Sequence, residues 1–307
     1  MAIPLLVFLL LAASVWALWT PDRALADLQA KYQTPADETL LLLGNRVRLR
    51  DTGPKDAPAV LMLHGFGASL ETWEPWAQTL SQQMRVLRLD LPGSGLSGPD
   101  ATGDYSDTRT LALLVALLDQ RQLGKISVVG HSIGGRMAWT FAACHPERVN
   151  KLVLVAPDGF AIPGIAYGKR PEVPASMGLM RCTLPRWMLR MSLEPAYADP
   201  AALTDALLTR YFDLMLAPQS RNALLARLQD TVLVDPMPLL QSIQAPTLLL
   251  WGEQDAMIPF ANAADYVHAL PHAMLVGFDR VGHLPHEEAS VRSLAPLQQF
   301  LIDNKND

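Results

Sequence analysis

A serine set between an apolar run and a helical pattern is the feature that most constrains this chain. Residues 127–135 read SVVGHSIGG, which places Ser132 in a G-x-S-x-G turn between a β-type run and a helix. This context is typical of a nucleophile elbow. Gly130 and Gly134 leave room for the chain to reverse while the serine adopts a strained backbone conformation. The segment therefore predicts that Ser132 is an exposed nucleophile.

A nucleophilic serine needs a base, and the base needs a carboxylate that orients it. The apolar run 245–251 predicts a buried strand that leads to Asp255. The run 273–278 predicts a second short strand that leads to His283. Both side chains are expected on successive strand-end loops, and together with the serine they form a candidate catalytic triad.

Two alternatives remain open for the acid and the base. Asp158 follows the strand-like run 152–155 and is the rival acid, whereas His286 is the rival base. His283, His286 and Glu287 also lie close enough in sequence to suggest metal ligands. No third ligand at a suitable spacing accompanies the two histidines, and the zincin order is absent. No metal and no organic cofactor are therefore expected.

Six short motifs follow one another in a recognisable order between about residues 40 and 300. They are HGFG, DLPGSGLS, GHSIGG, LVLVAPDG, LLLWGEQD and GHLPHEE. In these motifs the chain resembles the α/β-hydrolases of the esterase and lipase type. The resemblance implies an eight-stranded, mostly parallel sheet with helices on both faces and a helical cap inserted after strand six. Ser132 stands at the nucleophile position, which argues against the haloalkane dehalogenase and epoxide hydrolase branches, where aspartate is expected.

The resemblance also implies where an oxyanion would be held. The run 59–63 predicts a central strand that ends in the HGFG motif. In this family the N–H group after the nucleophile, here of Ile133, acts together with an N–H group of the HGFG loop, here of Phe66. His64 and His131 adjoin the two loops and are candidates for contact with the substrate.

The order of the remaining elements is consistent with that architecture. After the first two strand-like runs, apolar runs alternate with helical patterns such as 108–123 and 262–270, which predicts a parallel sheet. Strands are expected near 40–43, 47–50, 59–63, 85–89, 126–130, 152–155, 247–251 and 274–278, with a hairpin turn at Gly44-Asn45. The hydrolase core is expected over 36–159 and 236–307, and the cap over 160–235.

The N-terminus predicts a membrane anchor. Residues 3–19 form an uncharged run that, as a helix, would extend about 25 Å, near the lower limit for a span. We therefore expect a transmembrane or signal-anchor helix over 1–19 and a juxtamembrane amphipathic helix over 20–35. A cleaved signal peptide is the alternative, but no Lys or Arg precedes the run. The side of the membrane stays open, and Cys144 and Cys182 are expected to be unpaired.

The cap is expected to set substrate choice. Met177, Trp187 and Met188 are candidates for contact with an apolar substrate, because flexible thioethers suit long or varied apolar groups. Basic residues gather in the same region, at positions 169, 170, 181, 186 and 190, although the whole chain has a formal net charge of -5. The cap would then rest on an anionic lipid surface. The alternative is an ordinary solvated face.

These observations predict a membrane-anchored serine hydrolase that cleaves carboxylic esters with apolar acyl chains, with a phospholipase as one form. One alternative is a carbon–carbon bond hydrolase or lactonase that acts on small carboxylated substrates. Another is a hydrolase fold that binds a ligand without catalysis. Nucleic acid is not expected as a partner, because the chain is acidic and has neither a P-loop nor a dinucleotide fingerprint. The oligomeric state is left open.

Overall fold

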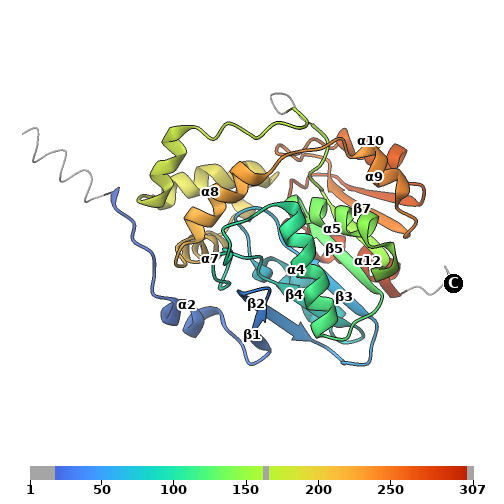
Figure 1. Cartoon of the computed structure of the whole chain (residues 1–307). Coiled ribbons are helices and arrows are strands. Elements are labelled where there is room, and N and C mark those ends of the chain that lie inside the picture. Colours follow the sequence, from blue (N-terminus) through green and yellow to red (C-terminus); the bar gives the residue numbers. More distant parts are fainter. Residues whose placement is uncertain (1–17, 162–165, 303–307) are drawn as a thin grey trace, which may run out of the picture.

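An eight-stranded sheet runs through the centre of the computed structural model, which describes residues 18–161 and 166–302 (Figure 1). The strand order is β1-β2-β4-β3-β5-β6-β7-β8. The strands are β1 Asp37–Leu42, β2 Asn45–Thr52, β3 Ala59–Leu63, β4 Arg85–Leu89, β5 Ile126–His131, β6 Val149–Val155, β7 Thr247–Gly252 and β8 Ala273–Phe278. β1 and β2 pair antiparallel, as do β2 and β4, whereas every other neighbouring pair is parallel. The predicted mixed, mostly parallel sheet is confirmed.

Two apolar clusters fill the space between the sheet and its helices. One cluster packs α4 (Asp107–Gln120), α5 (Ile133–Cys144), α9 (Met237–Ser242) and α10 (Asn262–Ala269) against one face. The other packs α3 (Glu74–Leu80) and α12 (Ser290–Ile302) against the opposite face. The central strand β3 is buried along its whole length because helices cover both of its faces. Helices on both faces, as predicted, leave the carboxyl ends of the parallel strands as the edge where loops meet.

The hairpin that opens the domain turns one residue earlier than the predicted Gly44-Asn45 pair. Leu42 pairs with Asn45, so the turn is made by Leu43 and Gly44, whose φ angles are 48° and 86°. Two consecutive left-handed residues are the requirement of a type I′ turn. Glycine meets this requirement without strain, whereas Leu43 adopts an uncommon conformation for a residue with a side chain.

The segment between β6 and β7, where a helical cap is expected, is largely helical. It contains 3₁₀ helices at Ala175–Arg181, Glu194–Ala196 and Pro200–Ala202, and α-helices α6 (Arg186–Leu193), α7 (Asp205–Met215) and α8 (Ser220–Asp230). A third apolar cluster, separate from those of the sheet, holds them together and includes Leu189, Leu208 and Tyr211. Leu284, on the loop after β8, belongs to the same cluster. The cap therefore has its own core, which also contacts the loop that carries His283.

The chain enters the described region along the edge of the cap. The Thr20 N–H donates to Cys182 O at 2.9 Å, and the Leu184 N–H donates to the Thr20 hydroxyl at 3.1 Å. Helix α2 (Leu25–Tyr32) follows and lies beside the hairpin in Figure 1. Within residues 18–161 and 166–302, no helix is long and apolar enough to cross a membrane. Most of the anchor predicted over 1–19 lies outside the described residues.

A buried carboxylate fixes this N-terminal segment to the cap. Asp213, on α7, has no exposed side-chain surface and is contacted by Arg23 at 2.8 Å, Lys31 at 2.6 Å and the Tyr32 hydroxyl at 2.8 Å. Its hydrogen bond to the ammonium group raises the pKa of Lys31. The helix expected at the membrane surface is therefore bonded to the cap through its polar residues.

Asp213→Asn should lower the free energy of unfolding by about 1–3 kcal/mol, because a buried charge is removed from two half-exposed cationic partners. Asp205→Asn, on the same helix but exposed, is the control and should change stability by less than about 0.5 kcal/mol. Urea unfolding of the three proteins measures the difference. Equal stability of the two variants would show that the Asp213 cluster contributes nothing to holding the segment.

Candidate active site

Ser132 lies on a sharp turn between β5 and α5, with φ of 54° and ψ of -121°. Its N–H donates to Val155 O, at the end of β6, at 3.0 Å. A Cβ atom on Gly130 would lie 2.2 Å from Gly134 O, and one on Gly134 would lie 2.4 Å from Leu63 O. No side chain fits at either position without movement of backbone. The turn therefore has the strained geometry that its sequence predicted.

His283 and Asp255 meet at the same edge of the sheet. His283 Nδ1 lies 2.7 Å from Asp255 Oδ2, and both side chains are buried. A carboxylate only accepts, so Nδ1 carries the proton and Nε2 keeps its lone pair for a proton from a nucleophile. The N–H groups of Met257 and Ile258 donate to the other carboxylate oxygen of Asp255, at 2.8 and 2.9 Å. In the described part of the chain, no hydrogen bond joins Ser132 Oγ to the His283 ring.

Asp158, the rival acid, faces a different partner. Its Oδ2 accepts from Arg136 at 2.9 Å, its N–H donates to Ser132 O at 3.0 Å, and its carbonyl accepts from the Trp139 indole at 3.0 Å. Burial raises the pKa of this carboxyl group, although the arginine opposes the shift. Asp158 thus supports the backbone of the elbow, and it is Asp255 that contacts the histidine.

The loop that carries His283 is held between the core and the cap. The His283 N–H donates to Ala196 O of the cap at 2.7 Å. A Cβ atom on Gly252 would lie 2.0 Å from Gly282 O, and one on Gly282 would lie 2.5 Å from Ala196 O. Backbone therefore approaches backbone on both sides of the loop. The position of the imidazole depends on the cap as well as on the sheet.

The two histidines named as substrate contacts are buried against the backbone. His131 Nε2 lies 3.0 Å from His283 O, and the ring is 4.6 Å from the His283 ring. His64 accepts from the Leu91 N–H at Nε2 and faces Gly65 O at Nδ1, at 3.1 and 2.8 Å. Burial lowers the pKa of both rings, strongly for His131. Their contacts are those of neutral groups that position the two loops of the site.

His286 and Glu287 lie in a buried cluster whose other members the sequence did not indicate. His286 Nε2 lies 2.9 Å from the Thr72 hydroxyl, which donates to Glu287 at 2.5 Å. Tyr197 and Arg210 of the cap also bond to Glu287, the former at 2.8 Å. These charge-assisted hydrogen bonds hold the pKa of the Glu287 carboxyl below its ordinary value, although burial alone would raise it. His286 therefore makes a structural contact with Thr72 and does not face Asp255.

The loops expected to hold an oxyanion share a small cavity. Phe66 and Ile133 both line it, and its volume is about 10 Å³. Ile133 is the first residue of α5, where backbone N–H groups have no partner within the helix. A Cβ atom on Gly65 would lie 3.2 Å from the Cβ atom of Ser132, so the HGFG loop approaches the serine closely. The two predicted donors therefore border one space.

The cap residues expected to contact substrate lie farther out. Trp187 and Met188, on α6, are 61% and 49% exposed, and Met177 is half-buried in the first 3₁₀ helix. None of the three lines the small cavity beside Phe66 and Ile133. Cys144 and Cys182 are both free, as predicted, and both are exposed.

Comparison with known proteins identifies the family. Residues 58–290 match the family model described as alpha/beta hydrolase fold. The chain is 30% identical over 250 residues to a 2-hydroxy-6-oxononadienedioate/2-hydroxy-6-oxononatrienedioate hydrolase of Cupriavidus pinatubonensis, covering 78% of this chain and 84% of the relative. It is 33% identical over 234 residues to the pimeloyl-[acyl-carrier protein] methyl ester esterase of Vibrio cholerae, covering 74% and 87%.

Similarity to solved structures agrees with this result. The crystal structure of a membrane phospholipase A matches with a TM-score of 0.75 and 23% identity, covering 100% of this chain and 99% of that chain. At this level of identity the match concerns the fold. The protein belongs to the α/β-hydrolase family, whose members among its relatives include both ester hydrolases and carbon–carbon bond hydrolases.

The buried histidines make stability depend on pH in a defined window. Burial lowers the pKa of His286 to about 3, from the ordinary 6.5 of an unfolded chain. The free energy of unfolding should therefore decrease as pH falls below about 6.5, by up to about 1.4 kcal/mol per pH unit and histidine, because the unfolded chain takes up protons first. The lowered pKa of the Glu287 carboxyl group adds to this loss of stability only below pH 4.5, its ordinary pKa.

Urea unfolding between pH 6.5 and 5 tests this expectation. His286→Gln should give a shallower dependence on pH than the natural protein, whatever its own stability. Identical slopes would show that this ring is not held neutral in the folded state.

Proposed function

We propose that the protein is a serine hydrolase that cleaves carboxylic esters with Ser132, His283 and Asp255 as its catalytic triad. The observation that carries the proposal is the 2.7 Å contact between His283 Nδ1 and Asp255, because it leaves Nε2 free to act as a base. The strained turn at Ser132 supports it, since such a turn presents the hydroxyl above the sheet. The esterase from Vibrio cholerae, 33% identical, supports ester chemistry.

Each side chain has one role in the proposed reaction. Ser132 attacks the carbonyl carbon of the ester while His283 Nε2 takes its proton. Asp255 holds the imidazole in this orientation and stabilises the imidazolium that forms. The N–H groups of Phe66 and Ile133 donate to the negative oxygen of the tetrahedral intermediate. His283 then returns the proton to the leaving alcohol, and water releases the acyl group in a second cycle of the same steps.

Ser132→Ala and Asp255→Asn should each lower kcat on a p-nitrophenyl ester by a factor on the order of 10³ or more. The first removes the nucleophile, and the second removes the charge that orients His283. Asp158→Asn is the matched control, because this carboxylate adjoins the elbow but pairs with Arg136, and it should cost far less. A greater loss for Asp158→Asn than for Asp255→Asn would make Asp158 the acid.

The competing functions are separated by two measurements. Carbon–carbon bond cleavage is supported by the 30% identity to the hydrolase from Cupriavidus pinatubonensis. A higher kcat/KM on 2-hydroxy-6-oxononadienedioate than on p-nitrophenyl octanoate would favour that activity. A protein that binds a ligand without catalysis would not be labelled by a fluorophosphonate probe, whereas an active Ser132 would be.

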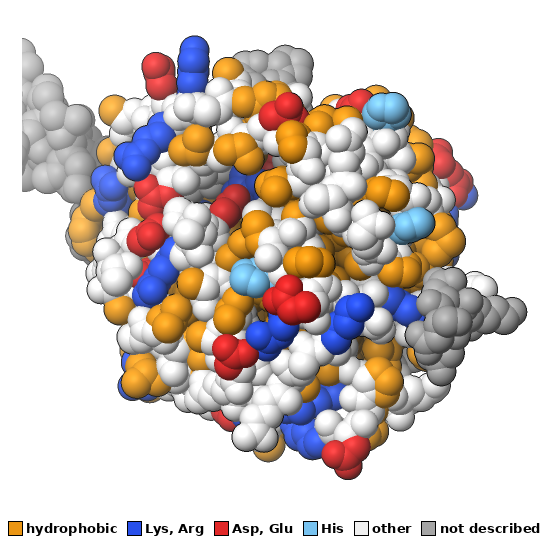
Figure 2. All heavy atoms as spheres, turned by 45° about the vertical axis from the view of Figure 1, so that its right-hand side comes forward, with side chains coloured by type: hydrophobic (Ala, Val, Ile, Leu, Met, Phe, Trp, Pro, Cys, Tyr) orange, Lys and Arg blue, Asp and Glu red, His pale blue; other side chains and the backbone are white. Residues whose placement is uncertain are grey.

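We also propose that the substrate is presented at a membrane, with residues 1–19 as the anchor. Support comes from exposed apolar side chains on the surface of the cap and on the two residues with which the described region begins. These residues are Leu18, Trp19, Leu179, Trp187, Met188 and Met191. Basic, acidic and hydrophobic side chains are interspersed along the upper left edge of Figure 2, on the side where the cap lies in Figure 1. Such a surface suits the interface of an anionic lipid layer.

The basic residues of the cap are poor targets for a test of this contact. Arg186 donates to the Thr209 hydroxyl at 2.7 Å, and Arg190 contacts Asp205 at 2.7 Å, so both join α6 to α7. Reversal of their charges would loosen the cap itself. The exposed apolar residues Trp187 and Met191 offer a cleaner change, because neither is needed to fill the core.

Trp187→Gln combined with Met191→Gln should lower the rate on esters carried in anionic vesicles by about tenfold, through the lost burial of apolar surface in the interface. The rate on a soluble p-nitrophenyl ester should change much less. Leu41→Gln, which replaces another exposed apolar residue on β1, is the control. Equal losses on vesicles and on the soluble ester would exclude a membrane contact of α6.

A further inference from the structure

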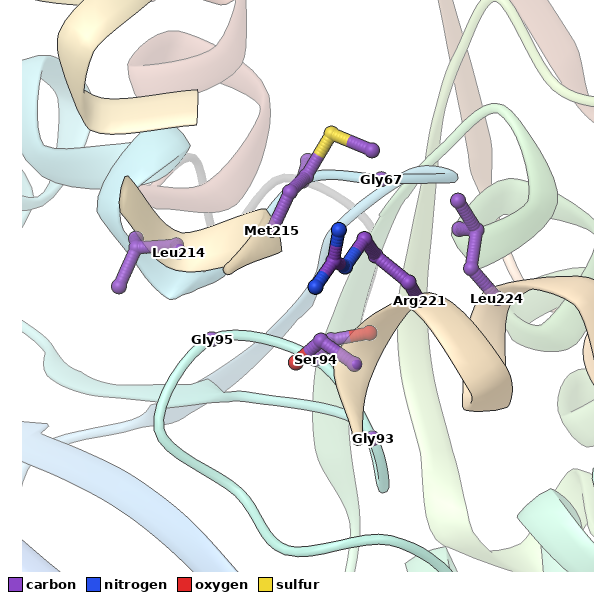
Figure 3. Close-up of a pocket in the computed structure, with 10 residues that line it drawn as sticks. Gly67, Gly93, Ser94, Gly95, Leu214, Met215, Arg221 and Leu224 are labelled. Atoms are coloured by element: carbon purple, nitrogen blue, oxygen red, sulfur yellow. The ribbon is translucent and has the colours of Figure 1, made fainter. Parts of the chain in front are cut away.

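Two small cavities follow one another between α8 of the cap and the loops of the core. The outer cavity, of about 20 Å³, is shown in Figure 3, where the Arg221 side chain extends between the loop of Gly67 and the turn at Ser94. The inner cavity, of about 10 Å³, shares Gly67, Gly93 and Ser94 with the outer one and adds Phe66 and Ile133. We call the two cavities the slot. Its inner end borders the proposed oxyanion site.

Arg227, on α8, lines the inner end of the slot and has an unusual environment for a buried arginine. Its side chain is 4% exposed, and its Nη2 donates to Pro92 O at 3.1 Å. Its Nη1 is buried and has no hydrogen-bond partner among the described residues. In the described ranges, every other buried arginine contacts a carboxylate, as Arg221 contacts Asp22 at 2.7 Å.

A buried charge without a partner destabilises the folded protein. We therefore expect the Arg227 guanidinium to bind a group of opposite charge. The guanidinium lies over the Tyr105 ring, 5.3 Å from the centroid, which offsets part of that cost. Burial lowers the pKa of Arg227 to about 10, against attraction from Asp107, Tyr105 and Asp100. The group therefore remains charged at neutral pH. A carboxylate bound at Nη1 would complete its hydrogen bonds.

We propose that Arg227 binds a carboxylate group of the substrate at the inner end of the slot. The inference rests on the proposed ester hydrolysis and narrows it: the ester carries a free carboxylate in addition to its apolar chain. The position follows from the shared lining of the cavity, since Arg227 borders the same space as Phe66 and Ile133. A guanidinium donates strong, charge-assisted hydrogen bonds to a carboxylate.

The size of the slot favours a carboxylate over a phosphodiester. About 10 Å³ is room for one water-sized group, so one carboxylate oxygen fits beside Nη1, whereas a phosphodiester with two substituents would collide with the lining. The turn at Gly93 leaves no spare room, because a Cβ atom there would lie 2.1 Å from the Ala223 Cβ atom of α8. Carboxylate half-esters are thus the substrates to test.

The test compares p-nitrophenyl half-esters of succinate, glutarate and adipate with neutral p-nitrophenyl esters of matched length. Arg227→Met should lower the ratio of kcat/KM for the charged ester to that for the neutral ester by about 10- to 100-fold, the range expected for one charge-assisted hydrogen bond. Arg227→Lys should restore part of the ratio. Arg88→Met is the matched control: this arginine of β4 is equally buried, but it lies outside the slot and its charge is already paired with Glu74.

A binding measurement separates this inference from the proposed reaction. In a Ser132→Ala background, adipate should raise the melting temperature more than adipamide at the same concentration, and addition of Arg227→Met should remove the difference. If no ester is hydrolysed but adipate stabilises the protein through Arg227, the proposed reaction fails and the carboxylate site stands. If esters are hydrolysed and neither the ratio nor the adipate effect depends on Arg227, the carboxylate site is overturned.

Discussion

The backbone conformation of Ser132 is the constraint on which the rest of the site depends. Its φ of 54° is tolerated because the N–H bonds to Val155 O of β6, and because Gly130 and Gly134 let β5, α5 and the end of β3 approach within distances that no Cβ atom allows. The same close approach brings the HGFG loop to the serine. A buried, doubly covered sheet supplies the rigidity that holds one strained residue in place, since strain persists only where the surroundings fix it.

The base of the proposed triad is positioned by the cap as much as by the sheet. Asp255 orients the ring of His283, but the backbone of this residue bonds to Ala196 of the cap, and Glu287, four residues later, is bonded to Tyr197 and Arg210 of the cap. Because the Glu287 side chain is only 2% exposed, displacement of the cap would leave this charged group with the Thr72 hydroxyl but without Tyr197 and Arg210. The cap is therefore a structural part of the site.

The strands, the elbow and the order of the triad loops were predictable because each depends on residues close together in sequence. The predicted strand limits differ from those of the structure by a few residues at most, as for β6, which begins at Val149 where 152 was expected. The partners of Asp213, Glu287 and Arg227 were not predictable. Each pairing joins residues far apart along the chain, and a lone Asp, Glu or Arg in a helical pattern carries no sign that it will be buried. The contact of Asp158 with Arg136, which decides between two candidate acids, is of the same kind.

Helix α8 contacts both the N-terminal segment and the slot. Arg221, in its first turn, bonds to Asp22 of the N-terminal segment, and Arg227, about 9 Å farther along the helix, lines the slot beside the proposed oxyanion site. The helix also lies close to the turn at Gly93. The same N-terminal segment is bonded to α7 through Asp213. The segment where the chain enters the described region is thus bonded to both α7 and α8, through Asp213 and through Arg221. Because Arg227 lies on the same helix as Arg221, one helix of the cap joins the N-terminal segment to the slot.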